Sequence, residues 1–505
     1  MALTHKVNKV LYVRLPVWKI YPGGVIYIAD FIHKLRPGVE QRILDFALIP
    51  ASRRRRVLRA LLEEFKPDVV AFSWRNMQTF GPHPENEALD VVMNFDYSPN
   101  PLKRLKSAFS ALGIIYDYAA SRINNFAFMK LVRKQLPAAT VVVGGTAASI
   151  FGQHVIKKCP SNSIVVIGEG EPTMLSVVDG DESLEGHYYT KDEQGRVVHH
   201  SGQENFELEN LTAPNFEYIE SIFPGFREYL DQEIGVHTKR GCPFQCHFCL
   251  YNKIEGSRQR YRDPVEIVKE IETLNKVYGV EKIWFTDAQF CSTRPSMNHV
   301  ERILDQMIAR NVKVRWAGYL RLNFLNQEIA KKMLLSGLDS IDLSFTGTQE
   351  NIDRLTLGYK LKQQMEAFNL FKEAGHTDQK IKLYMPLNAP GETEEALLTN
   401  INKINELYTL FGRDNVLPFI FFIGVQPGTP IEDKLLREGY LKRGYNPLTL
   451  NPFTIKRLLY NPEPLGRMIG RAYLKALDKS NADFDYVGRA TMKLLEEELL
   501  ARQSG

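Results

Sequence analysis

Short apolar runs alternate with amphipathic stretches along the first third of the chain. Between the runs, apolar residues recur at helical spacing. Strand and helix in regular alternation predict a doubly wound parallel α/β sheet. An interruption rich in aromatic residues and proline, at 76–125, is predicted to fold as an insertion over the loop end of this sheet. The strand-length runs lie at 7–15, 42–48, 67–73, 140–145 and 163–171.

The alternation is lost over residues 181–232 and resumes at 233. Six further strand-length runs, each followed by a helical stretch, predict a partial (β/α)6 barrel, whose reactive residues belong at the carboxyl ends of the strands. The predicted domains are an α/β domain at 1–180, a linker with one hairpin at 181–232, the barrel at 233–438 and a helical region at 439–505. The barrel strands are expected at 235–238, 281–286, 313–317, 339–345, 380–385 and 417–424.

Composition narrows the class of protein. The 505 residues are 44% hydrophobic and 24% charged, as in globular proteins, and a net charge of +5 is too small to favour a nucleic-acid partner. The first ten residues lack a signal-peptide core, and no apolar run approaches membrane-spanning length. Five cysteines, three of them clustered, do not resemble a disulfide framework. We therefore expect a cytoplasmic protein without a transmembrane segment.

The cluster of cysteines is the sharpest chemical signal. Cys242, Cys246 and Cys249 follow the spacing C-x3-C-x2-C. Three closely spaced thiolates suit a four-iron cluster with one iron left open to bind a small molecule. A zinc knuckle completed by His237 or His247 is the alternative, although zinc ligands usually come as two separated pairs.

The edge of the predicted first sheet also carries residues that suggest a ligand-binding site. Its strands end in Ser73-Trp74, in Gly144-Gly145 and in Gly168-Glu169-Gly170-Glu171. Ligands of such sheets bind outside the carboxyl ends of the strands, where glycine lets a bulky ligand approach the backbone. The G-x-G-x-x-G fingerprint is absent, so a nicotinamide or flavin cofactor is not favoured.

From residue 7 to about 440, the chain resembles the radical S-adenosylmethionine (SAM) superfamily. The resemblance rests on the cysteine loop and the strands that follow it, and the VVVGG and GEGE strand ends resemble the subgroup with an N-terminal cobalamin (B12)-binding domain. It implies that Cys242, Cys246 and Cys249 hold a [4Fe–4S] cluster whose open iron binds SAM. An electron, supplied by a reductant such as ferredoxin or flavodoxin, then splits SAM and yields a 5′-deoxyadenosyl radical.

The resemblance also implies contacts with SAM. Phe248 would border the adenine and Asp287 the methionine part, unless Asp287 only caps the next helix. Arg321 would pair with a carboxylate, unless it is a surface arginine. Many relatives carry a glutamate in G-x-E-S on the fourth barrel strand; here Ser344 and Thr346 would be its neutral polar substitutes. In Pro390-Gly391-Glu392-Thr393, Thr393 suits a helix cap.

For cobalamin, the resemblance implies a site at the edge of the first sheet. The motif D-x-H-x-x-G, which supplies a lower histidine ligand, is absent, so another side chain, water or nothing would meet that face. Trp18 and Trp74 have ordinary apolar packing as their alternative. The predicted cobalamin-binding residues are Trp18, Ser73, Trp74, Arg75, Gly144, Gly145, Gly168, Glu169, Gly170 and Glu171.

Three functional hypotheses follow. The first is a cobalamin-dependent radical enzyme that methylates an unactivated carbon of a small-molecule or natural-product substrate. The second is an oxidative cyclase, or another non-methylating radical enzyme, acting on a tetrapyrrole-like substrate. The third is a non-catalytic sensing or assembly protein, suggested by the absent glutamate at Thr346.

Overall fold

The computed structural model describes residues 7–75, 87–202, 206–451, 454, 459–479 and 484–504, without the side chains of residues 87, 88 and 484. The chain folds into two compact units that interleave in sequence. Unit 1 comprises Met1–Met77, Ala119–Pro243 and Tyr251–Trp284. Unit 2 comprises Gln78–Tyr118, Phe244–Leu250 and Phe285–Gly505.

Unit 1 is built on a seven-stranded sheet in the order β2-β1-β3-β4-β5-β6-β7. The first five strands of that order are parallel, and they follow the flavodoxin-like winding, in which the chain reverses direction between β1 and β3. The predicted doubly wound sheet is confirmed. The strands are β1 (Lys9–Arg14), β2 (Glu40–Asp45), β3 (Val69–Ser73), β4 (Thr140–Gly144), β5 (Ser163–Ile167), β6 (His187–Lys191) and β7 (Val197–His200).

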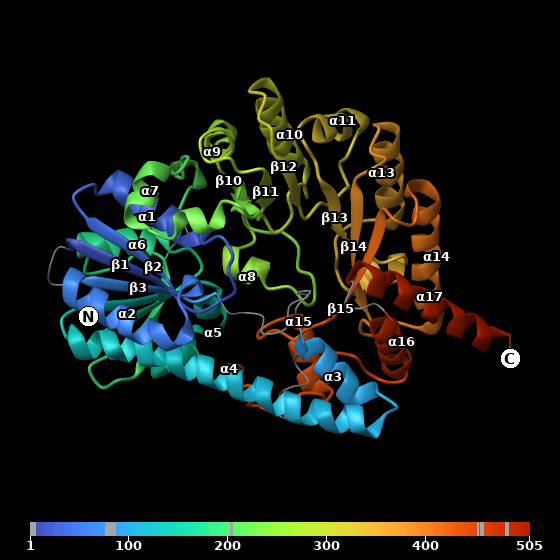
Figure 1. Cartoon of the computed structure of the whole chain (residues 1–505), viewed down its shortest axis with the longest axis horizontal. Coiled ribbons are helices and arrows are strands. Elements are labelled where there is room, and N and C mark those ends of the chain that lie inside the picture. Colours follow the sequence, from blue (N-terminus) through green and yellow to red (C-terminus); the bar gives the residue numbers. More distant parts are fainter. Residues whose placement is uncertain are drawn as a thin grey trace. The chain divides into compact units, whose positions relative to one another are not determined.

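Helices cover both faces of this sheet, with α1 (Gly23–Leu35) and α6 (Glu171–Asp179) on one face and α2 (Ala51–Phe65) on the other (Figure 1). Helix α2 buries Leu58, Leu62 and Phe65, spaced by one helical turn, while its basic run at 53–56 stays at the surface. The remaining elements around the sheet are η1 (Phe46–Leu48), α5 (Thr146–Lys158), η2 (Leu208–Asn210), α7 (Phe216–Ile222) and η3 (Phe226–Tyr229).

The segment at 181–232 was predicted as a linker with one hairpin, but it packs as part of unit 1. Its hairpin, β6 and β7, pairs antiparallel with β5 and extends the sheet. Helix α7 then buries Phe216 and Ile219. Apolar residues in this segment are spread over short elements, so the sequence shows no sustained period there.

The six predicted strands of the partial barrel all form, beginning with β8 and β11, which are neighbours in one sheet. Unit 1 holds this first portion, and the buried Arg262 links it to the sheet helix α1: its guanidinium contacts Glu270 at 2.7 Å and the Tyr27 hydroxyl at 3.3 Å. The elements are β8 (Ile234–Val236), β9 (Lys239–Arg240), α8 (Tyr251–Glu255), β10 (Arg260–Tyr261), α9 (Pro264–Lys276) and β11 (Lys282–Phe285).

Unit 2 holds the later barrel strands. Strands β13, β14 and β15 pair in parallel, and bridges at Trp316–Leu338 and Tyr319–Asp342 join β12 to β13. Helices α13 and α14 run alongside these strands (Figure 1). The elements are α10 (Arg294–Ala309), β12 (Arg315–Gly318), α11 (Gln327–Leu335), β13 (Ser340–Ser344), α12 (Gln349–Arg354), α13 (Leu361–Glu373), β14 (Lys380–Leu387), α14 (Glu394–Phe411), β15 (Val416–Phe422) and α15 (Pro430–Arg437).

Whether the insertion covers the loop end of the first sheet stays a prediction, because the sheet belongs to unit 1 and residues 78–118 belong to unit 2. Residues 76–86 lie outside the described part, and α3 (Glu87–Tyr97) packs in unit 2 against α16 (Leu465–Lys479). The Tyr97 hydroxyl donates to the Asn461 carbonyl at 2.9 Å, and the Tyr473 hydroxyl donates to Asp90 at 3.0 Å. The C-terminal region is helical as predicted, since α16 is followed by α17 (Phe484–Gln503).

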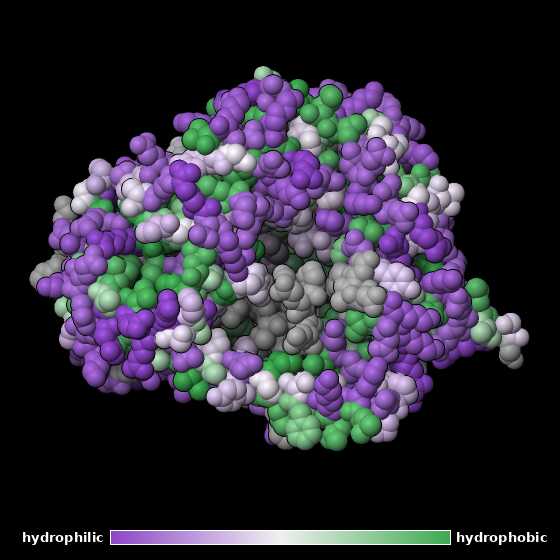
Figure 2. Space-filling view, in the orientation of Figure 1, coloured by the Kyte–Doolittle hydropathy of each residue, from purple (hydrophilic) through white to green (hydrophobic). Residues whose placement is uncertain are grey.

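Helix α4 (Pro101–Gln135) carries an apolar stripe on its outer face, visible as green residues along the lower edge of Figure 2. The stripe residues recur at alternating intervals of three and four, which places them on one face. They are Leu102, Leu105, Phe109, Leu112 and Tyr116. Within the described residues, no helix is both long and apolar enough to cross a bilayer.

Candidate active site

The cysteine loop begins in unit 1 at Gly241, whose backbone lies very close to the backbone of Arg258. Gly241 has φ +92°, and a side chain there would put its Cβ 1.9 Å from the Arg258 carbonyl oxygen. Only glycine fits both conditions. The next residue, Cys242, donates its amide to the Gly256 carbonyl at 3.0 Å. The loop is therefore anchored where the first of the three cysteines begins.

Cys246 and Cys249 lie in the part of the loop that belongs to unit 2. The Cys249 amide donates to the Cys246 carbonyl at 3.0 Å, which forms a turn between them. None of the three cysteines forms a disulfide among the described residues. The described residues contain no group of three or more His, Cys, Asp and Glu side chains arranged around one metal ion. A four-iron cluster makes a different demand, because each cysteine binds a separate iron. Three cysteine thiols match the donor set that such a cluster requires.

The segment Leu355–Tyr359 runs along this loop and holds it. The His247 amide donates to the Leu355 carbonyl at 3.1 Å, and the Thr356 hydroxyl donates to the Gln245 carbonyl at 2.6 Å. The Ile431 amide donates to the His247 carbonyl at 3.1 Å. Hydrogen bonds from two other segments thus fix the loop backbone between Cys242 and Cys249.

Arg321 belongs to the same arrangement. Its guanidinium lies 3.8 Å from the centre of the Phe244 ring and donates to the Leu357 carbonyl. A Cβ at Gly358, where φ is +72°, would lie 2.4 Å from the Phe244 ring. Arg321 is 7% exposed, so its reading as a surface arginine is wrong. The sequence did not indicate its stacking on the cysteine loop, because 77 residues separate Phe244 from Arg321.

Three more predicted SAM contacts are placed in unit 2. Phe248 is half-buried and lies edge-on to Phe421, with ring centres 6.1 Å apart. Asp287 is buried just beyond β11, and Thr293, not Asp287, caps the next helix α10. The capping alternative for Asp287 is therefore wrong. Ser344 is the half-buried last residue of β13.

Thr346 is engaged in a buried network that the sequence did not reveal. Its hydroxyl donates to the Asn400 side-chain oxygen at 3.1 Å, and the Asn400 amide group donates to Glu392 at 3.0 Å. Asn351 donates to the same carboxylate at 3.1 Å. Burial raises the pKa of Glu392 to about 7, against the opposing effects of backbone donors at Ala389 and Asn388 and of the nearby Arg354. The Thr346 hydroxyl is thus already committed within the protein.

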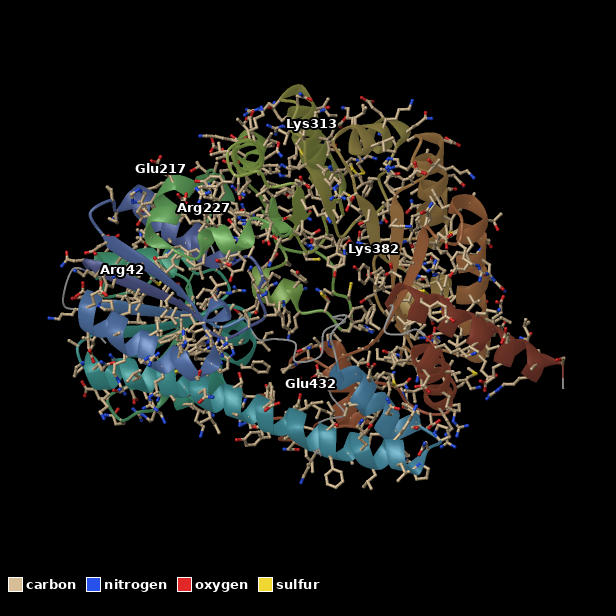
Figure 3. The ribbon with its side chains drawn as sticks, in the orientation of Figure 1. Arg42, Glu217, Arg227, Lys313, Lys382 and Glu432 are labelled. Carbon is tan, nitrogen blue, oxygen red and sulfur yellow. The ribbon has the colours of Figure 1, made fainter. Side chains whose placement is uncertain are left out.

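Side chains of β13, β14 and β15 point alternately to the two faces of their sheet. One face is fully buried, and the other carries larger, partly exposed side chains. Lys382, labelled in Figure 3, lies 3.6 Å from Asp342, which also accepts from the Tyr384 hydroxyl at 3.1 Å. Burial raises the pKa of Asp342, although the charge of Lys382 opposes that shift. The Tyr384 ring stacks on Phe419 with centres 5.4 Å apart. This face therefore combines an aromatic wall with an acid–base pair.

At the edge of the unit 1 sheet, the predicted cobalamin residues of β3 and β4 come together. The Trp74 amide donates to the Gly144 carbonyl at 2.9 Å. Gly145 has φ +92°, and a Cβ there would lie 2.8 Å from the Trp74 carbonyl oxygen, so glycine is required. A Cβ at Gly144 would meet no atom within 4 Å. Gly168, at the end of β5, donates its amide to the Ser149 hydroxyl at 2.9 Å.

The tryptophans and Arg75 differ in exposure. Trp74 is buried and lies edge-on to Phe126 at 5.4 Å, which agrees with the apolar-packing alternative. Trp18 is 46% exposed, so it is not a core residue. Arg75 is exposed, and its carbonyl accepts from the Thr146 hydroxyl at 2.8 Å. Ser73, the last residue of β3, is half-buried.

The carboxylates of the GEGE stretch are ion-paired with arginines. Arg240 on β9 contacts Glu171 at 2.7 Å and Glu169 at 3.1 Å, and Arg260 on β10 contacts Glu169 at 2.6 Å. Burial raises the pKa of Glu171, but the charge and hydrogen bonds of Arg240 outweigh burial and lower it. A Cβ at Gly170 would lie 2.8 Å from the Ile28 side chain. The two carboxylates therefore stabilise the fold through ion pairs, and their assignment to cobalamin binding stays a prediction.

A polar cluster that sequence analysis missed lies at the ends of β1 and β2. Arg14 donates to Asp45 at 2.8 Å, and the Tyr229 hydroxyl donates to the same carboxylate at 2.6 Å. The second terminal nitrogen of Arg14 is buried without a hydrogen-bond partner among the described residues. An unsatisfied donor, the open space at Gly144 and the reversal between β1 and β3 fit a bulky polar cofactor at this edge.

Known proteins resemble this chain in its barrel region and in its whole fold. Residues 236–404 match the Radical SAM superfamily. The anaerobic magnesium-protoporphyrin IX monomethyl ester cyclase of Cereibacter sphaeroides is 27% identical over 263 residues, which are 49% of this chain and 42% of the cyclase. The uncharacterized methyltransferase PH0819 of Pyrococcus horikoshii is 25% identical over 243 residues, 46% of this chain and 51% of that protein. The chain thus spans about half the length of these curated relatives.

Two solved structures match nearly the whole chain. The radical SAM methyltransferase TsrM from Kitasatospora setae, with cobalamin and a [4Fe-4S] cluster bound, has a TM-score of 0.64 at 16% identity and covers 99% of this chain and 100% of its own. The cobalamin-dependent SAM radical enzyme OxsB, with aqua-cobalamin and SAM bound, has a TM-score of 0.62 at 15% identity and covers 99% and 80%. Residues 236–404 therefore form a radical SAM domain, and the chain as a whole shares the fold of these two solved enzymes.

Proposed function

We propose that this chain is a cobalamin-dependent radical SAM methyltransferase that acts on an unactivated carbon of a small molecule. The observation that carries the proposal is the fold match over 99% of the chain to a methyltransferase with cobalamin and a [4Fe-4S] cluster bound. The cyclase relative, 27% identical, supports an oxidative cyclase as the second candidate. In both cases a cytoplasmic location and a small electron-transfer protein, such as ferredoxin or flavodoxin, as reductant belong to the proposal.

The proposed roles divide between the predicted domains at 1–180 and 233–438. Cys242, Cys246 and Cys249 would hold the cluster. When bound, the cluster supplies the electron that splits SAM, and the corrinoid supplies the methyl group. The sheet edge with Ser73, Gly144, Gly145 and Gly168 would bind the corrinoid, and Arg75 would border it.

The barrel residues would orient SAM and exclude water. Phe248, half-buried beside the aromatic Phe421, offers an apolar face to a flat ring. Asp287 offers a buried carboxylate to a cationic group. The half-buried Ser344 offers a hydroxyl. The partly exposed wall of Tyr384 and Phe419 offers stacking surface to a substrate and keeps solvent away from a reactive carbon.

The reaction outcome tests the proposal. Anaerobically purified protein would first be analysed by mass spectrometry for retained small molecules, and the retained substrate would then be incubated with SAM and dithionite. A product heavier by one methyl group is expected. An oxidised or cyclised product without a new methyl group would replace methylation with the cyclase reaction. No 5′-deoxyadenosine above background would leave a sensing or assembly protein.

Replacing one loop cysteine tests the cluster assignment directly. Cys246→Ala should abolish the brown chromophore and all SAM cleavage after anaerobic reconstitution, because the cluster would lose one of three protein ligands. Cys159→Ala is the matched control: Cys159 also forms no disulfide among the described residues, but it is buried 3.7 Å from the Met129 sulfur, away from the loop. Cleavage retained in Cys246→Ala, or lost equally in Cys159→Ala, would end the assignment.

A further inference from the structure

Helix α4 turns its apolar stripe to solvent. An ordinary surface helix buries such a stripe against the core. The described residues leave this one uncovered, along the lower edge of Figure 2, and all of it belongs to unit 2. Exposed apolar surface of this extent marks an interaction site. The stripe residues and their exposed fractions are Leu102 76%, Leu105 56%, Phe109 67%, Leu112 56% and Tyr116 72%.

The opposite face of α4 is the one that packs on the protein. Ser107, on the side of the helix away from the stripe, is 8% exposed. The Tyr118 hydroxyl donates to the Leu448 carbonyl at 3.4 Å, and Lys103 contacts Asp478 at 2.9 Å. The helix is thus already formed and held with its leucines outward. A partner that binds the stripe does not have to offset the cost of ordering it.

The spacing of the stripe is that of a coiled-coil seam. Its residues follow intervals of three, four, three and four, which are the a and d positions of a heptad repeat over about four helical turns. Of the residues that flank this seam, only Ile115 is large and apolar; the others are Lys106, Ala108 and Gly113. A helix that lies in a lipid surface carries a wider apolar face. The narrow seam therefore favours a second helix as the partner.

The stripe is complementary to itself when two copies of α4 pair antiparallel. With a two-fold axis between positions 110 and 111, Leu105 faces Tyr116 of the second copy, and Phe109 faces Leu112 of the second copy. Each of the four layers formed in this way joins one leucine to one aromatic ring, so the layers are equally filled. In a parallel pair, rings would face rings and leucines would face leucines, which fills the seam unevenly.

Charge and surface area favour the same arrangement. The basic residues Lys103, Arg104 and Lys106 lie opposite positions 115–118 of the second copy, which include Asp117 and no basic residue. A parallel pair would place these cations beside their own copies. The stripe exposes on the order of 600 Å², the upper end for an apolar patch on a typical monomer. With its flanks it approaches the roughly 800 Å² that each partner buries in a standard interface.

We propose that helix α4 binds a second copy of this chain and that the two helices pair antiparallel in a two-fold symmetric dimer. The contact is made by Leu105, Phe109, Leu112 and Tyr116 of each copy. The inference does not depend on the proposed function, because the stripe includes no residue of the cysteine loop or of the sheet edge in unit 1.

Sedimentation velocity of the full chain at micromolar concentration tests the proposal. Wild type should sediment with twice the mass of one chain. The double variant Phe109→Lys/Leu112→Lys places two lysines in each central layer and should weaken association roughly a hundredfold or more. Both side chains are more than half exposed, so circular dichroism should show an unchanged fold. Leu335→Lys is the matched control, because Leu335 on α11 is 72% exposed, and this variant should remain dimeric.

The double variant Phe109→Glu/Leu112→Lys tests the antiparallel arrangement. In an antiparallel pair each glutamate meets a lysine, whereas in a parallel pair like charges meet. This variant should therefore associate at least about tenfold more tightly than the double-lysine variant. Equal association of the two variants, or a dimer that persists in the double-lysine variant, would overturn the inference. A monomeric wild type would also overturn it, and its flotation with phosphatidylglycerol vesicles would assign the stripe to a lipid surface.

Discussion

Glu392 makes hydrogen bonds that its sequence motif did not predict. The motif Pro390-Gly391-Glu392-Thr393 predicted a turn and a helix cap, and the cap is confirmed, since the Thr393 side chain accepts from the Ala396 amide at 3.1 Å. The partners of Glu392 come from elsewhere: Asn351 lies on α12, and Asn400 lies two turns along α14. Such partners are set by how helices pack, which one sequence does not encode locally. The contact between Arg321 and Phe244 could not be predicted for the same reason.

The raised pKa of Glu392 predicts a pH dependence of stability. In the unfolded chain the carboxyl has a pKa of 4.5, and in the folded protein about 7, so the folded state retains a proton that the unfolded state releases between these values. Its favourable contribution is complete below pH 4.5 and is lost as pH rises through about 7. The loss is about 3 kcal/mol at most.

Urea unfolding at pH 5 and pH 8 measures this effect. In Glu392→Gln the free energy of unfolding should change less between the two pH values than in wild type, since the variant has no proton to release there. Glu395, on the first turn of α14, is the control position, and Glu395→Gln should behave like wild type. Equal pH dependence in all three proteins would contradict the prediction.

At the scale of elements, local patterns predicted most of what forms. All six barrel strands and the five parallel strands of the first sheet follow from apolar runs of strand length. The packing of helices on one another did not follow. The contact of α3 with α16 joins segments more than 350 residues apart, as in the hydrogen bond from Tyr97 to Asn461. Two amphipathic helices look alike in sequence whether they cover a sheet or each other.

Helix α17 packs closely on β15, and this contact predicts a sensitive glycine. A Cβ at Gly488 would lie 1.8 Å from the Pro418 carbonyl oxygen, a backbone atom that cannot move aside alone. Gly488→Ala should therefore destabilise the protein by about 1–3 kcal/mol, as overpacking does. Gly113→Ala is the control, because Gly113 lies in helix α4 with no atom within 4 Å of the new Cβ.

Alanine at Gly113 should stabilise by about 0.5–1 kcal/mol, since glycine is the weaker helix former. Thermal unfolding of the two variants beside wild type distinguishes the cases. Equal melting temperatures for Gly488→Ala and wild type would show that α17 does not require the close approach to β15.

At the scale of the whole molecule, compact units need not follow chain order. Residues 78–118 precede much of unit 1 in sequence yet belong to unit 2, and residues 251–284 belong to unit 1. Closing a long loop costs only slightly more than closing a short one, so folding does not enforce contiguous units. Sequence patterns divide a chain only into consecutive segments, so they could not predict units that interleave. The domain boundaries at 180, 232 and 438 therefore stay a prediction.

The edge of the unit 1 sheet predicts how the two proposed cofactors can be separated. Gly144→Leu adds a side chain into space that meets no atom within 4 Å, so the fold should survive while the corrinoid is excluded. Absorbance should show at least a tenfold loss of cobalamin per protein, with iron content unchanged. Gly38→Ala, also in open space, should retain both. Full cobalamin occupancy in Gly144→Leu would remove this edge from the proposed site.

The pairing of Glu169 and Glu171 with Arg240 and Arg260 has a consequence for how this fold can change over time. Breaking a buried ion pair at one side leaves an uncompensated charge, which is strongly destabilising. Strands β9 and β10 can therefore accept a new residue at either arginine only together with a change after β5. Domain grafting that replaces the sheet but keeps the cysteine loop would leave guanidinium groups without counter-ions. The two segments must be inherited, or exchanged, as one piece.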